Sequence, residues 1–453
     1  MPLTIPSSIG EITGIRRTVV GVLAAGLISA AFAPSWFWAL LVGVVLAGIT
    51  ALAYRHLPAV CAAWTLVAGC TLEITLADLV GPAAFQPTIA VVKGAGIILA
   101  MMAIARFGFR PDVFNPASAF TVMFAGGLAH GLHPELSLTD SLRSLIGSVA
   151  PFAFSFSRLS PGWSAWIIRT APWIPVVGVA AALVLQLFGL RPMFVDSGGL
   201  RLTGLGHPAF LAGACLVGIY ASLIMLFRDG RRTHVTMLAL NFLLLVLTGA
   251  RAPLFYAVAV TGLSLALVRS PNWPIRSRVC IVLPLLVALP WLLPVAEGGT
   301  EVRALSLTLS DPGNLSGRDL LWPYFEELAS KSPWIGWGVG AGNVAVPPES
   351  GIIRLMHTWA AHNEYLRIEV EGGLIGSILL FALFTLWAWR HSAPLRQSDR
   401  VVIRLVFIAF ACHAYTDNVL ISSSACVLFT FVSAVFALGR ESKPLLINSA
   451  RCA

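Results

Sequence analysis

The long polar interval at residues 297–371 holds the side chains whose types could do chemistry. It ends on the run His362-Asn363-Glu364-Tyr365-Leu366, and Glu371 follows five residues later. An imidazole titrates near neutrality, so His362 could take a proton from a hydroxyl group. A single loop histidine is more often a structural hydrogen-bonding group, and its neighbours must decide between the two roles. Because an apolar run begins at residue 372, we expect His362 at the depth of a lipid headgroup.

Four arginines could form an anion site near this histidine. Arg201 lies in the stretch Arg201-Leu-Thr-Gly-Leu-Gly-His207-Pro208, Arg251 follows an apolar run directly, and Arg318 and Arg367 lie in the polar interval. A guanidinium grips phosphate oxygens bidentately and stays charged at any relevant pH. Each arginine alone could instead reach toward lipid headgroups or pair with an acidic residue. As a set they indicate an anion site.

The polar interval also carries side chains that could contact a sugar. Trp322, Trp334 and Trp337 could stack on sugar rings, although tryptophan is equally typical of the aromatic belt at a membrane surface. Asn363, Tyr365 and Glu371 lie next to the histidine in sequence and are expected to bind substrate with it.

The elements that must position these residues are membrane helices. Hydrophobic residues make up 57% of the chain and charged residues 11%, against about 25% charged residues in soluble domains. The composition therefore predicts an all-α polytopic membrane protein, since helices are the open structure that spans a bilayer. Apolar runs close to the spanning length of about 20 residues lie at 19–33, 36–53, 59–76, 88–105, 114–131, 172–190, 209–227, 233–250, 253–268, 279–296, 372–390, 402–416 and 419–438.

Arginine predicts the orientation, because short loops rich in Lys and Arg stay in the cytoplasm. Keeping these loops inside requires one further crossing at 142–157, a segment broken by Pro151. We expect 14 spanning helices, or 12 if part of 114–157 is re-entrant. Both counts place the termini in the cytoplasm and the 297–371 loop outside. The predicted domains are a transmembrane bundle at 1–296, a loop with short helices at 297–371, and C-terminal transmembrane helices with a short tail at 372–453.

Several classes of protein are excluded by what the sequence lacks. The net charge of +9 is scattered singly or in pairs along the expected cytoplasmic loops, so no nucleic acid partner is expected. No GxxxxGK[ST], HExxH, GxSxG or DxD motif occurs, and no cytoplasmic stretch could hold a nucleotide-binding domain. The seven cysteines show no CxxC spacing, and the pair His130 and His133 offers too few ligands for a metal. We expect neither a metal nor a cofactor.

The order of the motifs resembles the O-antigen ligase and Wzy-type polysaccharide polymerase family of bacterial inner membranes. The resemblance rests on Arg201-Leu-Thr-Gly204 with His207-Pro208, Thr248-Gly-Ala-Arg251, Leu315-Ser-Gly-Arg318 with Pro333-x-x-Gly336-x-Gly338, and the His362-Asn363 run ending at Gly376. The stretch Ala411-Cys-His413-Ala-Tyr-Thr-Asp417-Asn418 is also similar. The resemblance covers roughly residues 200–420. It departs from the family at Ala250, where relatives often have serine.

This resemblance implies an inner-membrane enzyme whose active site faces the periplasm. It would transfer a glycan from undecaprenyl diphosphate to a hydroxyl acceptor, with Arg201 and Arg251 on the diphosphate and His362 as the base. The stretch from Gly317-Arg318 to Trp322 favours an O-antigen or exopolysaccharide polymerase. An O-antigen ligase with a lipid A core acceptor stays open, as does a transporter or flippase of lipid-linked sugars. A flippase and a chain-length regulator are the protein partners that the resemblance implies.

Overall fold

The computed structural model describes residues 48–81, 83, 85–196, 200–269, 278, 320–353, 358, 360–420 and 423–439. The chain divides into two compact units, Met1–Val60 and Cys61–Ala453. In the first unit the described residues 48–60 are helical almost throughout, and α3 (Leu57–Gly69) begins there. The predicted apolar runs at 19–33 and 279–296, the first part of the predicted loop and Arg318 lie outside the described residues.

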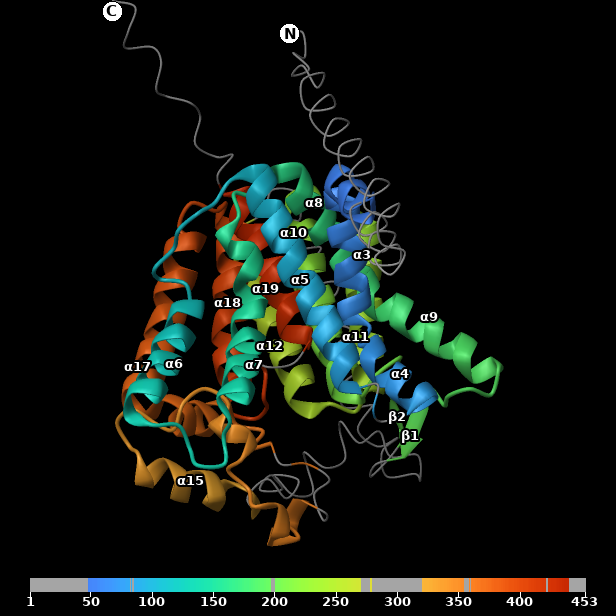
Figure 1. Ribbon diagram of the computed structural model, residues 1–453. Coiled ribbons are helices and arrows are strands. Elements are labelled where there is room, and N and C mark those ends of the chain that lie inside the picture. The colour runs from blue at the N-terminus through green and yellow to red at the C-terminus, as the bar shows by residue number, and fades with distance from the viewer. Residues whose placement is uncertain are drawn as a thin grey trace, which may run out of the picture. The chain divides into compact units, whose positions relative to one another are not determined.

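The described part of the second unit is built almost entirely from helices (Figure 1). Its first half contains α4 (Leu72–Val80), α5 (Phe85–Phe107), α6 (Ala117–His130), α7 (Leu138–Val149), η3 (Ala150–Phe156), α8 (Pro161–Thr170), η4 (Ala171–Trp173) and α9 (Ile174–Leu187). A two-stranded antiparallel hairpin follows, formed by β1 (Phe194–Asp196) and β2 (Leu200–Leu202). The second half contains α10 (Pro208–Asp229), α11 (Arg232–Leu247), α12 (Arg251–Leu267), α15 (Trp322–Lys331), η7 (Ala341–Asn343), η8 (Pro348–Ser350), α17 (Glu364–Ser392), α18 (Gln397–Ala414) and α19 (Ser423–Leu438).

The helices confirm the predicted class of an all-α polytopic membrane protein. Within the described residues, four helical segments are long and apolar enough to span a bilayer: Pro87–Phe107, Pro161–Leu187, Pro208–Asp229 and Glu364–Ser392. The pair α3 and α4, bent by 58°, adds a fifth if it counts as one span, and α6, α11, α12 and α19 are shorter apolar helices. The total of 12–14 crossings remains a prediction for the whole chain.

Proline breaks the helix where the sequence indicates it. The segment 142–157 begins in α7, and the chain changes to the 3₁₀ helix η3 with Pro151 in its first turn. Proline has no amide hydrogen and cannot continue the α-helical ladder. The aromatic ring of Phe152 in this turn is fully buried and packs against Phe384 and Phe429.

Helix α10 forms the centre of the second unit. Within its most apolar 18-residue stretch, 89% of the residues are buried, and the helix packs against α11, α12, α18 and α19. Helices α10, α12, α17 and α19 all begin at one end of the unit, the lower end in Figure 1, together with the hairpin and α15. We call this the site end and define it by His207, Arg251, His362 and Ser423. The ends of α10 and α17, at Asp229 and Ser392, lie at the opposite end.

Helix α17 is bent at Gly373, where φ is +59°. The backbone of residues 333–338 repairs the interrupted ladder: Trp337 N donates to Val370 O at 2.9 Å, and Leu374 N donates to Pro333 O at 2.8 Å. A Cβ atom on Gly373 would collide with the backbone of Trp334 and Ile335. The predicted boundary between the loop (297–371) and the C-terminal helices (372–453) lies next to this bend. Both sides of the boundary belong to α17.

Candidate active site

His362 occupies a sharp turn at the entrance to α17. Its φ is +48°, in the left-handed region where histidine is enriched among non-glycine residues. Asn363 follows as the N-cap of α17, and its side-chain oxygen accepts hydrogen bonds from Tyr365 N at 3.0 Å and Leu366 N at 3.3 Å. The helix therefore begins at Glu364, two residues after His362. The imidazole lies outside the helix and can face a neighbouring segment.

That neighbour is Asp417, in the connection between α18 and α19. His362 Nδ1 lies 3.0 Å from Asp417 Oδ1, and both side chains remain about 30% exposed. An ionised carboxylate can only accept, so Nδ1 carries the hydrogen and donates it to Asp417. The lone pair of a neutral imidazole is then on Nε2, and Nε2 has no hydrogen-bond partner among the described residues. This is the tautomer that a general base requires.

A buried ion-pair network connects the two segments that carry this pair. Glu364 Oε1 accepts from Leu420 N at 2.7 Å, and its Oε2 lies 2.5 Å from Arg367 Nε. Arg367 also bonds Glu371 at 2.9 Å, and all three side chains are nearly inaccessible to solvent. The network therefore holds the start of α17 against the loop that carries Asp417. It places Glu371, an expected substrate contact, against Arg367.

Arg201 reaches this region from β2. It is paired with Val195 in the hairpin register, and its Nε donates to Thr248 O at 2.8 Å, at the end of α11. The bond brings the hairpin to the connection 248–250 that leads into α12. Arg201 bonds to the first residue of this connection, and Arg251 directly follows its last residue. The two arginines, 50 positions apart in sequence, are therefore held near one another.

Arg251 is the first residue of α12. Its N-cap, Ala250, has no side-chain acceptor, and the hydroxyl of Thr248 accepts from Ala250 N instead. The side chain of Arg251 has no hydrogen bond or ion pair with any part of the chain that the structure describes. Free backbone N–H groups and the helix dipole favour an anion at such a helix start. The guanidinium and the helix start together form a cationic position without a described counter-charge.

His207 shows that these groups share one local electrostatic environment. It caps α10 by accepting from Ala209 N at its Nδ1, which must therefore be unprotonated. Burial of part of the imidazole lowers the pKa of His207, while the rest of the side chain is exposed to solvent. Arg201 and His362 lower the pKa further, and the carboxylate of Asp417 opposes them. His207, Arg201, Asp417 and His362 are therefore close enough to affect one another's charge.

The predicted aromatic contacts have partners within the protein. Trp322 Nε1 donates to Ala361 O at 2.9 Å, which fixes the start of α15 beside His362. Trp337 Nε1 donates to Leu328 O, and its ring packs against His133. The hydroxyl of Tyr365 donates to Ala411 O at 3.0 Å. Trp334 is 63% exposed and leaves its ring open.

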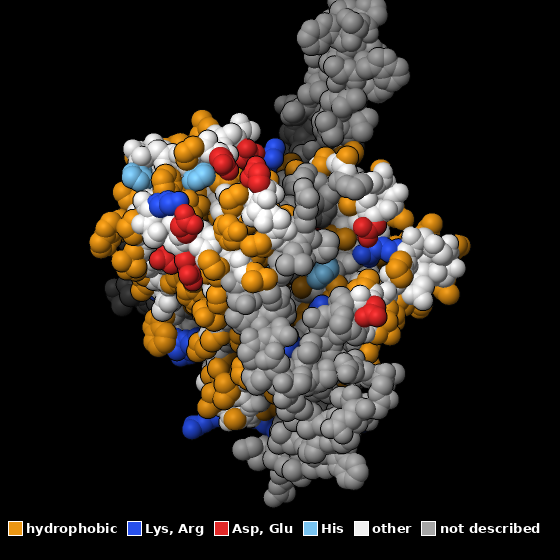
Figure 2. Space-filling model, turned by 90° about the horizontal axis from the view of Figure 1, so that it is seen from below, with side chains coloured by type: hydrophobic (Ala, Val, Ile, Leu, Met, Phe, Trp, Pro, Cys, Tyr) orange, Lys and Arg blue, Asp and Glu red, His pale blue; other side chains and the backbone are white. Residues whose placement is uncertain are grey.

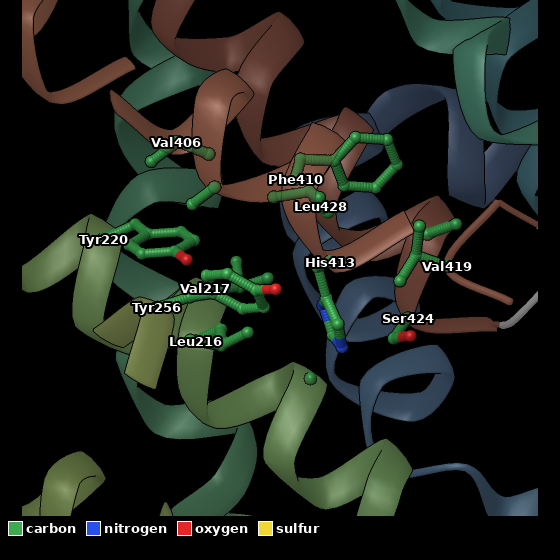
Figure 3. Close-up of a pocket in the computed structure, with 13 residues that line it drawn as sticks. Leu216, Val217, Tyr220, Tyr256, Val406, Phe410, His413, Val419, Ser424 and Leu428 are labelled. Atoms are coloured by element: carbon green, nitrogen blue, oxygen red, sulfur yellow. The ribbon is translucent and has the colours of Figure 1, made fainter. Parts of the chain in front are cut away.

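A small cavity lies inside the bundle, lined by residues 213–220 of α10, by Tyr256 of α12 and by residues of α18 and α19. Its volume is about 50 Å³, and Tyr220, Tyr256, His413 and Ser424 contribute its polar groups (Figure 3). The close-up shows the His413 ring between the apolar side chains of α10 and Ser424. Cavities that bind small molecules measure about 300–1,000 Å³, so this one suits water rather than a sugar. Figure 2 views the site end from below.

The structure thus brings His362, Asn363, Arg201 and Arg251 to one end of the unit. Asp417 belongs to a stretch that resembles the family, but the sequence assigned it no role. The covalent neighbours of Asp417 give no sign of its partner, which lies 55 positions earlier. Among the described residues, no three side chains from His, Cys, Asp and Glu are grouped so that they could hold a metal ion.

Comparison with known families agrees with the order of these motifs. Residues 235–381 match the family model described as O-antigen ligase, which confirms the resemblance over that segment. The match includes Arg251, the turn at 333–338 and His362. No curated protein sequence matches the chain.

Proposed function

We propose that this protein transfers a glycan from a lipid-linked diphosphate donor to a hydroxyl acceptor at the site end. The observation that carries the proposal is the His362–Asp417 pair, whose tautomer leaves Nε2 without a partner among the described residues, at the same end of the unit as Arg201 and Arg251. The family match supports a glycan-transfer role in O-antigen or polysaccharide assembly. The donor we propose is an undecaprenyl diphosphate glycan. The site then faces the periplasm of a bacterial inner membrane.

The acceptor half of the reaction depends on His362. Nε2 takes the proton of the acceptor hydroxyl while the acceptor oxygen forms a bond to the anomeric carbon. The imidazolium that results stays next to the carboxylate of Asp417, 3.0 Å from Nδ1. This arrangement stabilises the positive ring in the transition state more than the neutral ring in the ground state. A positioned base of this kind typically contributes about 10²–10⁴-fold to the rate.

The donor half depends on the cationic groups. The bond from the anomeric carbon to the diphosphate oxygen breaks, and its electron pair goes to the diphosphate. Arg251 at the start of α12 and the positive charge of Arg201 stabilise the charge that develops there. Cations that are already in place stabilise the negative charge that grows on the diphosphate in the transition state, and they need not move as this charge forms. Displacement in a single step inverts the anomeric centre.

The acceptor distinguishes two versions of this function. A polymerase adds the glycan to another lipid-linked glycan, whereas a ligase adds it to lipid A core. We favour the polymerase, because the stretch from Gly317-Arg318 to Trp322 resembles exopolysaccharide polymerases. A transporter would need polar residues along a path through the bilayer. Here Arg201, Arg251, His362 and Asp417 gather at one end, which favours the enzyme.

A purified assay tests the proposal. Full-length protein is mixed with an undecaprenyl-diphosphate-linked repeat, either alone or with lipid A core oligosaccharide, and the products are separated by mass. Products of two or more repeats support the polymerase, and a core-linked product supports the ligase. Movement of the unchanged donor across proteoliposomes without a new glycosidic bond would overturn the enzyme.

Sidedness needs a separate measurement. A cysteine between residues 340 and 350 should react with a membrane-impermeant thiol reagent in intact spheroplasts once the native thiols are removed. A cysteine at 229 or 230, at the opposite end of α10, should not react. The reverse labelling pattern would place His362 in the cytoplasm and overturn the periplasmic site.

A further inference from the structure

An apolar groove runs along α17 and α18, outside the site described above. Its volume is about 760 Å³, and one wall is formed by Leu374, Ile378, Phe381, Thr385 and Trp389 of α17. These positions recur every three or four residues and therefore share one face of the helix. At 1.5 Å per residue they extend over about 22 Å, more than half of the roughly 30 Å hydrocarbon core of a bilayer. Ile378 and Ile408 are more than half exposed, so the groove opens to the lipid.

The two ends of the groove carry opposite charge. The exposed carboxylate of Glu369 lines the end near Tyr365. Arg404 lines the other end, where its guanidinium lies 3.7 Å from the ring centroid of Trp389. Arg400 lies one turn before Arg404 and hence on the same side of α18, and Arg396 is the N-cap of this helix. The cationic end of the groove is thus at the opposite end of the unit from His362.

Arg404 retains donors for a ligand. Its Nε donates to Ser392 Oγ at 3.0 Å, which uses one of the five N–H groups of a guanidinium. Within the described part of the chain, no carboxylate lies within 4 Å of Arg404, whereas Arg228, at the same end, is 2.6 Å from Asp399. An ionisable side chain at membrane depth is costly unless it has a partner. The apolar wall and the remaining donors suit one molecule with an acyl chain and an anionic headgroup.

We propose that this groove binds an anionic phospholipid, with its headgroup at Arg404 and an acyl chain along α17 toward Tyr365. Basic pockets between membrane helices bind such headgroups by charge. The isoprenoid chain of the glycan donor would fit the apolar wall as well. Its diphosphate, however, would have to lie at the Glu369 end to reach His362, and the carboxylate there disfavours it. The lipid site is therefore separate from the transfer site and does not depend on the proposed function.

Binding of defined lipids to the delipidated full-length protein tests the proposal by native mass spectrometry. Phosphatidylglycerol and phosphatidylcholine with identical acyl chains are compared, with undecaprenyl phosphate as a third probe. We expect phosphatidylglycerol to bind about tenfold more tightly than phosphatidylcholine, because its headgroup carries a net negative charge, whereas the choline ammonium offsets the phosphate of phosphatidylcholine. Arg404→Gln should remove this preference. Arg390→Gln is the matched control, since Arg390 is at the same end but lies over Phe114 and does not line the groove.

A second variant tests the apolar part without removing a charge. Thr385→Trp places a ring in the groove from an exposed position and should weaken the binding of both phospholipids. Equal affinity of the wild-type protein for the two phospholipids would overturn the proposal. Equal losses in Arg404→Gln and Arg390→Gln would also overturn it, because the effect would then be nonspecific charge. Preferential binding of undecaprenyl phosphate that survives Arg404→Gln would assign the groove to the donor instead.

Discussion

The two ends of the second unit carry the same pair of side chains in two different settings. At the site end, His362 donates from Nδ1 to Asp417, and both side chains are about 30% exposed. At the opposite end, His391 Nε2 lies 2.6 Å from Asp112, and both side chains are only about 12% exposed. Arg110 lies 2.9 Å from the other ring nitrogen of His391. A guanidinium can only donate, so this Nδ1 must accept.

The difference shows what makes a histidine available for catalysis. His391 has both ring nitrogens engaged and joins two segments of the chain. Burial is the largest single effect and raises the pKa of Asp112, but the hydrogen bond and charge of His391, the amide of Phe114 and the charge of Arg110 together lower the pKa, so the carboxylate stays charged. His362 has Nδ1 bonded to Asp417, and its Nε2 has no hydrogen-bond partner in the described part of the chain. A catalytic histidine is therefore distinguished by its open nitrogen rather than by its acidic partner.

Replacing each histidine by alanine should give the largest contrast. His362→Ala should lower transfer by about 10²–10⁴-fold with little loss of donor binding, because the imidazole acts mainly in the transition state. His391→Ala should leave the rate per folded molecule within a few-fold and lower the thermal midpoint, since Arg110 and Asp112 lose their partner. Initial rates and thermal melts of both purified variants measure this. Wild-type rates in His362→Ala would falsify the assignment of the base.

Arg251→Lys should have the next largest effect. The lysine keeps the charge at the start of α12 but cannot reproduce the bidentate grip on a phosphate. Losing one charged hydrogen bond, worth about 1.5–3 kcal/mol, should lower transfer by roughly 10–100-fold. Arg143→Lys is a suitable control, since Arg143 lies on α7 with a highly exposed side chain. Near-normal polymer from Arg251→Lys would exclude the diphosphate role.

The sequence predicts the fold class, and it predicts which residues lie near the ends of the helices, because both depend on local patterns. Apolar runs of spanning length predict the helices, and Pro151 predicts the change from α7 to η3. The run that follows His362 predicts the entry into a membrane helix, and α17 begins two residues later. The sequence predicts Arg251 where a helix stops, and the structure places it at the start of the next helix, α12. The order of the motifs predicts the family that matches residues 235–381.

Pairings between distant segments could not be predicted in this way. The bond from His362 to Asp417 and the bond from Glu364 to Leu420 N each join residues more than 50 positions apart. Glu371 is polar and close to His362 in sequence, so the pattern favours a substrate contact. It lies two turns into α17, however, and the helix carries it away from the exposed end and against Arg367. The substrate role of Glu371 remains a prediction.

Asp417→Asn sharpens the comparison between the two acidic partners. An asparagine retains the volume but can present its amide to the ring, which no longer favours the tautomer with the hydrogen on Nδ1. We expect about a tenfold loss of transfer, less than for His362→Ala because the base itself remains. Asp112→Asn should change stability but not the rate. Equal rate losses in the two variants would mean that both pairs are structural.

The smallest effect should come from Ala250→Ser, which adds the hydroxyl that relatives often have. Ala250 is the N-cap of α12, and Pro253 lacks an amide hydrogen, so Ala252 N is the donor that a serine could satisfy. A serine N-cap typically stabilises a helix by about 1 kcal/mol over alanine, which should appear as a small rise in the thermal midpoint. The cap would occupy a donor that otherwise faces the diphosphate, so we expect donor affinity to stay constant or fall slightly. A gain in affinity together with the gain in stability would show instead that the added hydroxyl binds the donor.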